Sequence, residues 1–401
     1  MAEDGPKLTA LGKFFIFLFV ALCIGGAYYV FTNKTSNSPT GKNAPSSGGL
    51  LDSFGSGDQV ELGVAYGTEK QKWLEWAVQE FAKTRDGKHI KVDLIPMGSL
   101  EGAHALLNGD KRINVWSPAS ALYKDIFVQE WQVKYSQNPI LKEEPLALSP
   151  MVFVFWDERY QAFVQRYKTT SFATVSQALA EKGGWDAIAH KPEWGLFKFG
   201  HTHPNESNSG LMSIVLAAYS YQKKTKDLEL MDILDVGFQN WLQNFERGVS
   251  GFSNSTGNMM REMVLKGPSS YDALLVYENV AIDYLKNAEG RWGQIRVSYP
   301  EYNEWNDNPY YIIDAPWSTK EQKKAAEAFL AFLSSEPIQK ESLVHGFRPA
   351  NPNVPVKFAE SPFVRYAGYG VQVDLAKICE PPRAEVVNNL LQSWQRSQAN
   401  R

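Results

Sequence analysis

Four short turns rich in hydroxyl and amide side chains are the parts of this sequence best suited to chemistry. Each turn follows an apolar stretch and precedes an amphipathic one: Gly67-Thr68, Gly98-Ser99, residues 207–210 and residues 255–257. The chemistry they offer is hydrogen bonding, because the N-terminus of a helix presents free N–H groups and the positive end of its dipole to an anion or another polar ligand. Several such bonds, at about 1.5–3 kcal/mol each, would reach the roughly 8 kcal/mol of micromolar binding without a lysine or arginine.

The same turns also have a simpler interpretation, in which each one only caps its helix. In the stretch of residues 200–221, Asn208 or Ser209 can accept a hydrogen bond from the first free N–H groups of the helix that follows. Thr68 stands three residues before Gln71, which is the spacing of a capping box. The recurrence of the pattern at four junctions favours the binding interpretation, because two facing sheets would bring all four turns to one cleft.

Other candidate chemistry in the sequence is weak. No Cys-x-x-Cys, His-Glu-x-x-His, Walker or Gly-x-Ser-x-Gly motif occurs, and no Ser–His–Asp spacing is assembled. His201 and His203, with His104 and Glu101 elsewhere, would form a metal site only with a further ligand, and loop histidines more often bond to the backbone. We therefore expect no metal, no cofactor and no covalent catalysis.

Two carboxylates bear on the charge of a possible ligand. If Glu69 or Glu278 faced the cleft, an anion would be disfavoured and a cation or an amine-bearing solute favoured. We expect instead that Glu69 is a first-turn charge stabilised by its helix dipole and that Glu278 forms a structural salt bridge.

Composition bounds the class of protein. The 401 residues carry a formal net charge of -3 and no long basic run, so nothing favours nucleic-acid binding. A hydrophobic content of 44% is enough for a large core or two. The two cysteines, Cys23 and Cys379, lie far apart and predict no disulfide framework.

The N-terminal region predicts a membrane tether. Residues 14–31 are uncharged and at about 1.5 Å per residue just span a bilayer's hydrocarbon core. We expect a short tail at 1–13, a transmembrane helix at 14–31 and a flexible linker at 32–58, and equal numbers of lysines on the two flanks leave the orientation of the helix open. A cleaved signal peptide is the alternative, since Gly25 and Ala27 are small residues suitably spaced before a cut.

From Gln59 onward, strands alternate with helices and predict an α/β architecture of two lobes. The first two strands are expected at 60–66 and 90–96, and the helix after the turn at 255–257 is expected to carry Met259 and Met263 inward and to stop at 266–268. Lobe I is expected at 59–150 and 312–401, and lobe II at 151–311. Pro150 interrupts an apolar run at 146–156, which favours a strand crossing between lobes, and residues 308–317 are the second expected crossing. Ser318 with Glu321 is expected to cap a helix ending near Leu333.

Several stretches resemble a known family. They are Gly-Thr-Glu-Lys at 67–70 and the segments 97–109, 113–120, 200–211, 255–263, 267–279, 308–317 and 346–352. In these segments the chain is similar to the type II extracytoplasmic solute-binding proteins of ABC importers, especially a membrane-tethered branch sometimes fused to a von Willebrand A domain. The resemblance implies a two-lobed fold with two crossing strands as its hinge, and closure around a small solute. It also implies that the globular domain lies outside the cytoplasm (periplasmic or extracellular), which makes residues 1–13 a short cytoplasmic tail. By the family pattern the ligand-binding residues would be Thr68, Ser99, Ser117, Ser207, Asn208, Ser209, Ser255 and Tyr277.

These features support a membrane-tethered, extracytoplasmic protein that captures a small polar or anionic solute, an oxyanion or small organic acid, for import or sensing. Its expected partners are a membrane permease or a von Willebrand A-type protein. A second hypothesis is an envelope scaffold or interaction protein that keeps the fold but does not transport.

Overall fold

The computed structural model describes residues 59–285, 292–375 and 377–399 of the chain. The predicted tail, transmembrane segment and linker, at 1–13, 14–31 and 32–58, lie outside the described residues. Among the helices of the described residues, none combines the length and the apolar character that a membrane crossing requires.

Lobe I is built on a five-stranded sheet whose parallel strands deliver the first two polar turns. β1 pairs in parallel with β2 and β3, while β11 runs antiparallel between β3 and β4. An apolar cluster that includes Leu62, Trp73 and Phe329 packs this sheet against its helices. The strands in sheet order are β2 (Ile90–Pro96), β1 (Val60–Tyr66), β3 (Val115–Ser117), β11 (Pro309–Ile313) and β4 (Ile140–Pro145), and the helices are α2 (Gln71–Phe81), α3 (Ser99–Leu107), α4 (Lys124–Tyr135), α13 (Lys320–Leu333) and α14 (Glu336–Val344).

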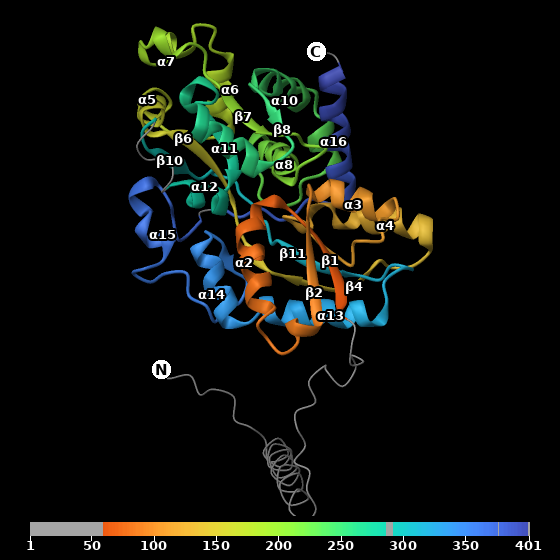
Figure 1. Cartoon of the computed structure of the whole chain (residues 1–401). Coiled ribbons are helices and arrows are strands. Elements are labelled where there is room, and N and C mark those ends of the chain that lie inside the picture. The colour runs from red at the N-terminus through yellow and green to blue at the C-terminus, as the bar shows by residue number, and fades with distance from the viewer. Residues whose placement is uncertain (1–58, 286–291, 376, 400–401) are drawn as a thin grey trace, which may run out of the picture. The chain divides into compact units, whose positions relative to one another are not determined.

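Lobe II repeats the same sheet plan. Its parallel strands β7, β8 and β9 lie beside the antiparallel strands β6 and β10. The strands in sheet order are β10 (Ile295–Ser298), β6 (Met151–Trp156), β9 (Ala273–Tyr277), β7 (Phe199–Thr202) and β8 (Phe252–Ser253). The helices are α5 (Asp157–Tyr167), α6 (Phe172–Ala180), α7 (Gly184–Ala189), α8 (Asn208–Gln222), α9 (Leu230–Leu234), α10 (Val236–Gly248), α11 (Thr256–Lys266) and α12 (Glu278–Leu285). Figure 1 shows the two lobes and the position of α8 and α11 in lobe II.

Two antiparallel chain segments cross between the lobes before α13, and among the described residues the chain passes from lobe I to lobe II once more after α14. Ser149 and Asn306 exchange backbone hydrogen bonds of 3.0 and 3.1 Å, and the Asn303 side chain bonds both the N–H and the C=O of Met151. Pro150 divides the first segment into β5 (Ala147–Leu148) and β6, as its missing N–H predicts. The second crossing was wrongly predicted at 308–317, because its apolar residues form β11 inside the lobe I sheet.

The C-terminal part of the chain also differs from its prediction. After β12 (Arg348–Pro349), which pairs with β5, the chain forms α15 (Pro362–Arg365) and α16 (Ala384–Ala399). Helix α16 packs against α8, α9 and α10 of lobe II as well as against α4. Residues 384–399 therefore do not belong to lobe I alone, because the apolar face of α16 is buried largely against lobe II.

Candidate ligand-binding site

A pocket with a cavity volume of about 160 Å³ lies between the lobes. This volume is roughly ten times the minimum that one water molecule needs, and smaller than typical sites for drug-sized ligands. It therefore suits a small solute. We call it the central pocket; its lining is Gly67, Thr68, Glu69, Pro96, Met97, Gly98, Ser99, Glu101, Ser207, Asn208, Asn254, Ser255, Thr256, Asn258 and Tyr277.

Four helical N-termini meet at the central pocket, two from each lobe. The short 3₁₀ helix η2 (Thr68–Lys70) and α3 begin at Thr68 and Ser99, and α8 and α11 begin at Asn208 and Thr256. The backbone N–H groups of these four residues donate to no other residue in the described part of the chain. The pocket therefore receives four unpaired amide donors and the positive ends of the helix dipoles.

Six of the eight predicted ligand-binding residues line this pocket. They are Thr68, Ser99, Ser207, Asn208, Ser255 and Tyr277. The other two are buried beside it without lining it. Ser117 accepts a backbone hydrogen bond from Gly67, and its hydroxyl has no partner among the described residues.

The hydroxyl of Ser209 is committed to other protein groups. Its Oγ lies 2.5 Å from Thr202 Oγ1, 2.6 Å from Thr256 Oγ1 and 3.2 Å from Ser207 Oγ, and the residue is fully buried. This chain of hydroxyls joins the end of β7 to the first residues of α8 and α11. The Ser209 side chain thus fixes the positions of two helix ends.

The helix caps differ in detail from the sequence prediction. Ser207 is the N-cap of α8, so Asn208 and Ser209 lie inside the helix, and no side chain caps it. Thr68 forms no capping box with Gln71, because η2 precedes α2. Ser255 does cap α11, accepting from the Asn258 N–H at 3.3 Å. The uncapped helix ends leave more free donors at the pocket than the capping interpretation allowed.

An ion pair stands at the edge of the central pocket. The Lys70 ammonium donates to Glu69 Oε1 at 2.5 Å and to the Pro118 carbonyl and Asn308 Oδ1, each at 3.1 Å. The Lys70 side chain is fully buried and that of Glu69 is 7% exposed. Burial lowers the pKa of Lys70, and the nearby Glu69 carboxylate opposes that shift. The Glu69 carboxylate thus faces the pocket with its charge balanced by Lys70. The sequence predicted a first-turn helix charge at Glu69 but not this ion pair.

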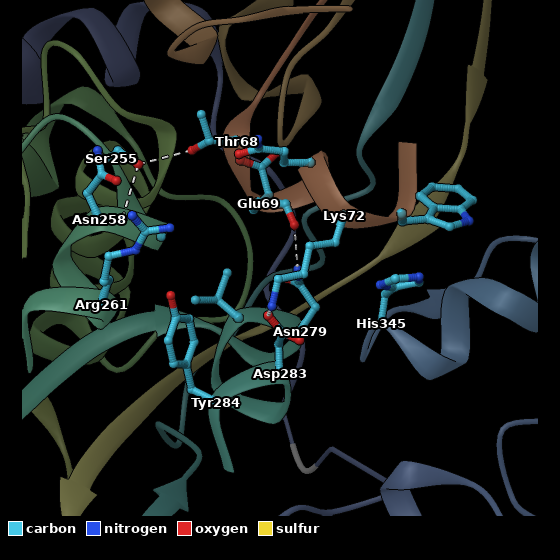
Figure 2. A pocket seen from close by; sticks show the side chains of 14 residues that line it. Thr68, Glu69, Lys72, Ser255, Asn258, Arg261, Asn279, Asp283, Tyr284 and His345 are labelled. Atoms are coloured by element: carbon cyan, nitrogen blue, oxygen red, sulfur yellow. Dashed lines mark hydrogen bonds and ion pairs between the residues drawn. The ribbon is translucent and has the colours of Figure 1, made fainter. Parts of the chain in front are cut away.

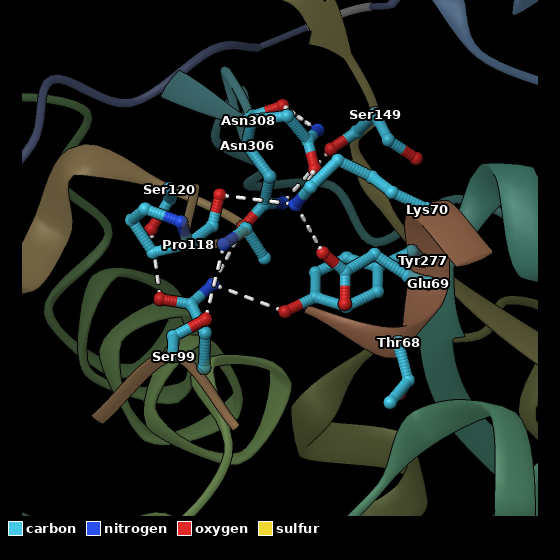
Figure 3. Close-up of polar contacts among 12 residues, drawn as sticks. Thr68, Glu69, Lys70, Ser99, Pro118, Ser120, Ser149, Tyr277, Asn306 and Asn308 are labelled. Atoms are coloured by element: carbon cyan, nitrogen blue, oxygen red, sulfur yellow. Dashed lines mark hydrogen bonds and ion pairs between the residues drawn. The ribbon is translucent and has the colours of Figure 1, made fainter. Parts of the chain in front are cut away.

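Asn208 connects the pocket to the hinge. Its partners Ser120, Tyr277 and Asn306 are labelled in Figure 3. Its Nδ2 donates to the Tyr277 hydroxyl and to Asn306 Oδ1, both at 3.1 Å, while its Oδ1 accepts from Ser120 Oγ at 2.8 Å. Burial raises the pKa of Tyr277 well above its usual value, so Tyr277 stays a neutral phenol. The side chain of Asn208 is therefore held by groups from both lobes and from the hinge.

The lobes are in contact across the cleft. Thr68 Oγ1 and Ser255 Oγ lie 3.0 Å apart, and Asn279 Nδ2 donates to the backbone oxygen of Glu69 at 3.0 Å. With the Ser120–Asn208 bond these contacts join lobe I to lobe II on several sides of the pocket. The arrangement is a closed one, in which a captured molecule would be surrounded by both lobes.

The remaining candidate groups have structural partners. Arg348 donates to both carboxylate oxygens of buried Glu278 at 2.8 Å, which confirms the predicted structural salt bridge. His201 is buried, with Nδ1 at 2.8 Å from the Thr202 carbonyl oxygen and Nε2 at 3.2 Å from Glu246 Oε1. No group of three or more potential His, Cys, Asp or Glu metal ligands occurs among the described residues.

Sequence reasoning missed Lys70 and the hinge asparagines. Lys70 follows Glu69 in a turn, and nothing in that spacing separates a buried ammonium from an ordinary exposed lysine. Asn306 and Asn308 stand in a polar segment, and their roles depend on the distant residues they meet. The Thr256 side chain could have been found, because it belongs to the polar turn already recognised at 255–257, and Asn258 directly follows that turn.

Several solved structures share the fold of this chain. The chain is similar to the sulfate-binding protein SubI of Mycobacterium tuberculosis at 14% identity and a TM-score of 0.56, covering 86% of this chain and 99% of that one. It is similar to the periplasmic binding protein AfuA of Actinobacillus pleuropneumoniae, solved with fructose-6-phosphate, at 11% identity and a TM-score of 0.57, covering 84% and 98%. Iron-bound HitA of Pseudomonas aeruginosa matches at 14% identity and a TM-score of 0.54, covering 85% and 99%.

The sequence comparisons identify the family. No curated protein matches the chain by sequence. The profile of the bacterial extracellular solute-binding proteins matches residues 62–348, which is most of the chain and includes every residue of the central pocket. The chain therefore belongs to the bacterial extracellular solute-binding protein family and has the two-lobed type II periplasmic-binding fold.

Proposed function

We propose that this protein captures a small anionic solute, an oxyanion or a small organic acid, in the central pocket. The observation that carries the proposal is the convergence of four unpaired helix-terminal amides, on Thr68, Ser99, Asn208 and Thr256, at one pocket between two lobes. Each helix end contributes roughly 0.3–1 kcal/mol toward a nearby negative charge. Hydrogen bonds to a charged group add about 1.5–3 kcal/mol each, so a few contacts reach the roughly 8 kcal/mol of micromolar affinity.

The carboxylates at the central pocket do not remove its preference for an anionic solute. Glu69 is neutralised by Lys70 at 2.5 Å. Glu101 accepts a hydrogen bond from the Gly98 N–H at 3.0 Å and is exposed, so solvent screens its charge. Glu101 nevertheless supports a second candidate, a solute that pairs an anionic group with an amine.

We further propose that the lobes close on the solute and that the protein delivers it to a membrane permease or reports its presence to a partner. The apolar segment at 14–31 supports a membrane tether that keeps the domain at the outer surface. Of the similar proteins, SubI is a sulfate-binding protein, AfuA was solved with fructose-6-phosphate and HitA with iron. These ligands support a test panel that includes both anions and metals.

Thermal melting of the full chain against a ligand panel tests the proposal. The panel contains sulfate, phosphate, molybdate, acetate, succinate, fructose-6-phosphate, glycine, glucose and ferric iron. A ligand present at 100 times its Kd stabilises the folded state by about 2.7 kcal/mol, so at least one anion should raise the Tm by several degrees. Stabilisation by glycine but not by acetate would favour a solute that bears an amine. Stabilisation by ferric iron alone would favour a metal as the ligand. A folded sample that responds to nothing would favour the envelope-scaffold alternative.

A further inference from the structure

A second pocket, with a cavity volume of about 120 Å³, adjoins the central one between the same two lobes. The two pockets share Thr68, Glu69, Ser255 and Asn258, so the Thr68–Ser255 hydrogen bond stands at their common wall. We call it the Arg261 pocket; its further lining residues are Gln71, Lys72, Trp73, Gly257, Arg261, Asn279, Val280, Asp283, Tyr284 and His345.

The charges of the Arg261 pocket do not balance. Both lining carboxylates have a lysine partner: Glu69 pairs with Lys70, and Asp283 pairs with Lys72. Arg261 also lines the pocket, is exposed to solvent, and has no carboxylate of the described residues within ion-pair distance of its guanidinium. With Lys70 included, which pairs with Glu69 but lines neither pocket, one positive charge is left over beside a site built for anions.

The placement of the groups fits an acidic ligand. Figure 2 shows Arg261 and Tyr284 rising from α11 and α12 on one side of the pocket, with Lys72 and His345 on the other. The N–H of Gly257, in the first turn of α11, has no protein partner among the described residues. An arginine can bind a carboxylate or phosphate through two parallel hydrogen bonds, and lysine, phenol and amide donors stand around the same space.

The wall between the two pockets is suited to a molecule that reaches through both. Thr68 and Ser255 are joined by a single hydroxyl–hydroxyl bond, and both side chains line both pockets. A hydroxyl can turn its O–H toward a bound oxygen, so each of the two can exchange its present partner for a ligand atom.

We propose that the solute carries a second acidic group and that this group binds in the Arg261 pocket while the first occupies the central pocket. The inference rests on the proposed function and narrows its substrate class from small anions to compact molecules with two acidic groups. Asp283 stays paired with Lys72, and Arg261 supplies the main charge-assisted contact to the second group.

Three matched pairs of probes test this inference on the full chain by calorimetric titration. Each pair keeps one acidic group and adds a second in place of a hydrogen: propionate and succinate, methanesulfonate and sulfoacetate, methylphosphonate and phosphonoacetate. In whichever pair binds (carboxylate, sulfonate or phosphonate), the molecule with two acidic groups should bind the natural protein at least about tenfold more tightly than its one-group partner. Arg261→Gln should abolish that gain and leave the affinity for the one-group probe within about twofold.

Arg85→Gln is the matched control, because Arg85 is exposed on lobe I and lines neither pocket. This variant makes the same change in net charge and should keep the gain. Equal binding of both members of a pair, or an Arg261→Gln variant that keeps the gain, would overturn the inference while leaving anion capture intact. A natural protein that binds none of the six probes would overturn the inference, and one that also fails to respond to every anion of the melting panel would overturn the proposed anion function as well.

Discussion

Thr68 and Ser255 come from different lobes and are separated by 187 positions in the sequence, yet their hydroxyl oxygens lie 3.0 Å apart. The contact joins the first helical turn after β1 to the N-cap of α11. Because the two residues also line the central pocket, lobe closure and ligand binding share the same side chains. A molecule that binds there acts directly on the equilibrium between open and closed lobes.

Thr68→Val should weaken ligand binding with little effect on the stability of the ligand-free fold. The change removes a single neutral hydrogen bond of about 1 kcal/mol, which corresponds to roughly a fivefold loss of affinity. Titration calorimetry with the best ligand of the melting panel measures this loss. Ser255→Ala should cost more stability, because the Ser255 hydroxyl also caps α11. Unchanged affinity in Thr68→Val would show that the contact between lobes plays no part in capture.

Ser209→Ala should lower folding stability more than it lowers affinity. The Ser209 hydroxyl contacts Thr202, Ser207 and Thr256 in a fully buried chain, so its removal leaves buried hydroxyls with fewer partners. The expected cost is about 1–3 kcal/mol in the free energy of unfolding, measured by urea denaturation. Ser207→Ala is the matched comparison, since Ser207 lines the pocket and, within the part of the chain that the structure describes, its side chain bonds only to Ser209. A larger effect of Ser209→Ala on affinity than on stability would assign its side chain to the ligand.

The sequence was most informative where local composition decides the structure. The strands predicted at 60–66 and 90–96 have those bounds in the structure, because each is a mainly apolar segment of strand length closed by a turn. The methionines predicted to face inward on α11, such as Met259 and Met263, are fully buried. The helix ends before Gly267, whose φ is positive at 68°. The polar turns were found by the same reasoning, and six of the eight residues named from the family resemblance line one pocket.

Features that depend on distant contacts were not predictable from the sequence. Thr319, not Ser318, caps α13 with Gln322, since both hydroxyl residues suit a cap and only the local backbone selects one. Lys70 is buried because Pro118 and Asn308 supply oxygen atoms from far along the chain. Helix α16 lies against lobe II through contacts that include the Trp394 bond to Glu246 at 2.7 Å.

Lys70→Met should strongly reduce anion affinity, because it leaves the Glu69 carboxylate unpaired at the pocket. Breaking a buried ion pair by removing one partner costs about 3–5 kcal/mol, so the single variant should also melt at a lower temperature. The double variant Lys70→Met with Glu69→Gln removes both charges and should regain much of the stability and of the affinity. A double-mutant cycle on both quantities checks the coupling. Additive effects of the two substitutions would contradict the charge-balance role assigned to Lys70.

Glu304→Gln should make the protein less sensitive to alkaline pH. Glu304 lies buried in the second crossing segment, and its Oε2 has no partner among the described residues. Burial first, and then the charge of Asp307, raises its pKa from 4.5 to about 8, so the folded state holds the proton more tightly than the unfolded chain. The resulting stability is present below pH 4.5 and is lost as the pH rises through about 8, by at most about 1.4 kcal/mol per pH unit. Urea denaturation between pH 5 and pH 9, with steps of about 1 unit, should show the natural protein losing stability relative to Glu304→Gln across this window. Parallel pH profiles of the two proteins would mean that Glu304 titrates normally and that the hinge tolerates its charge.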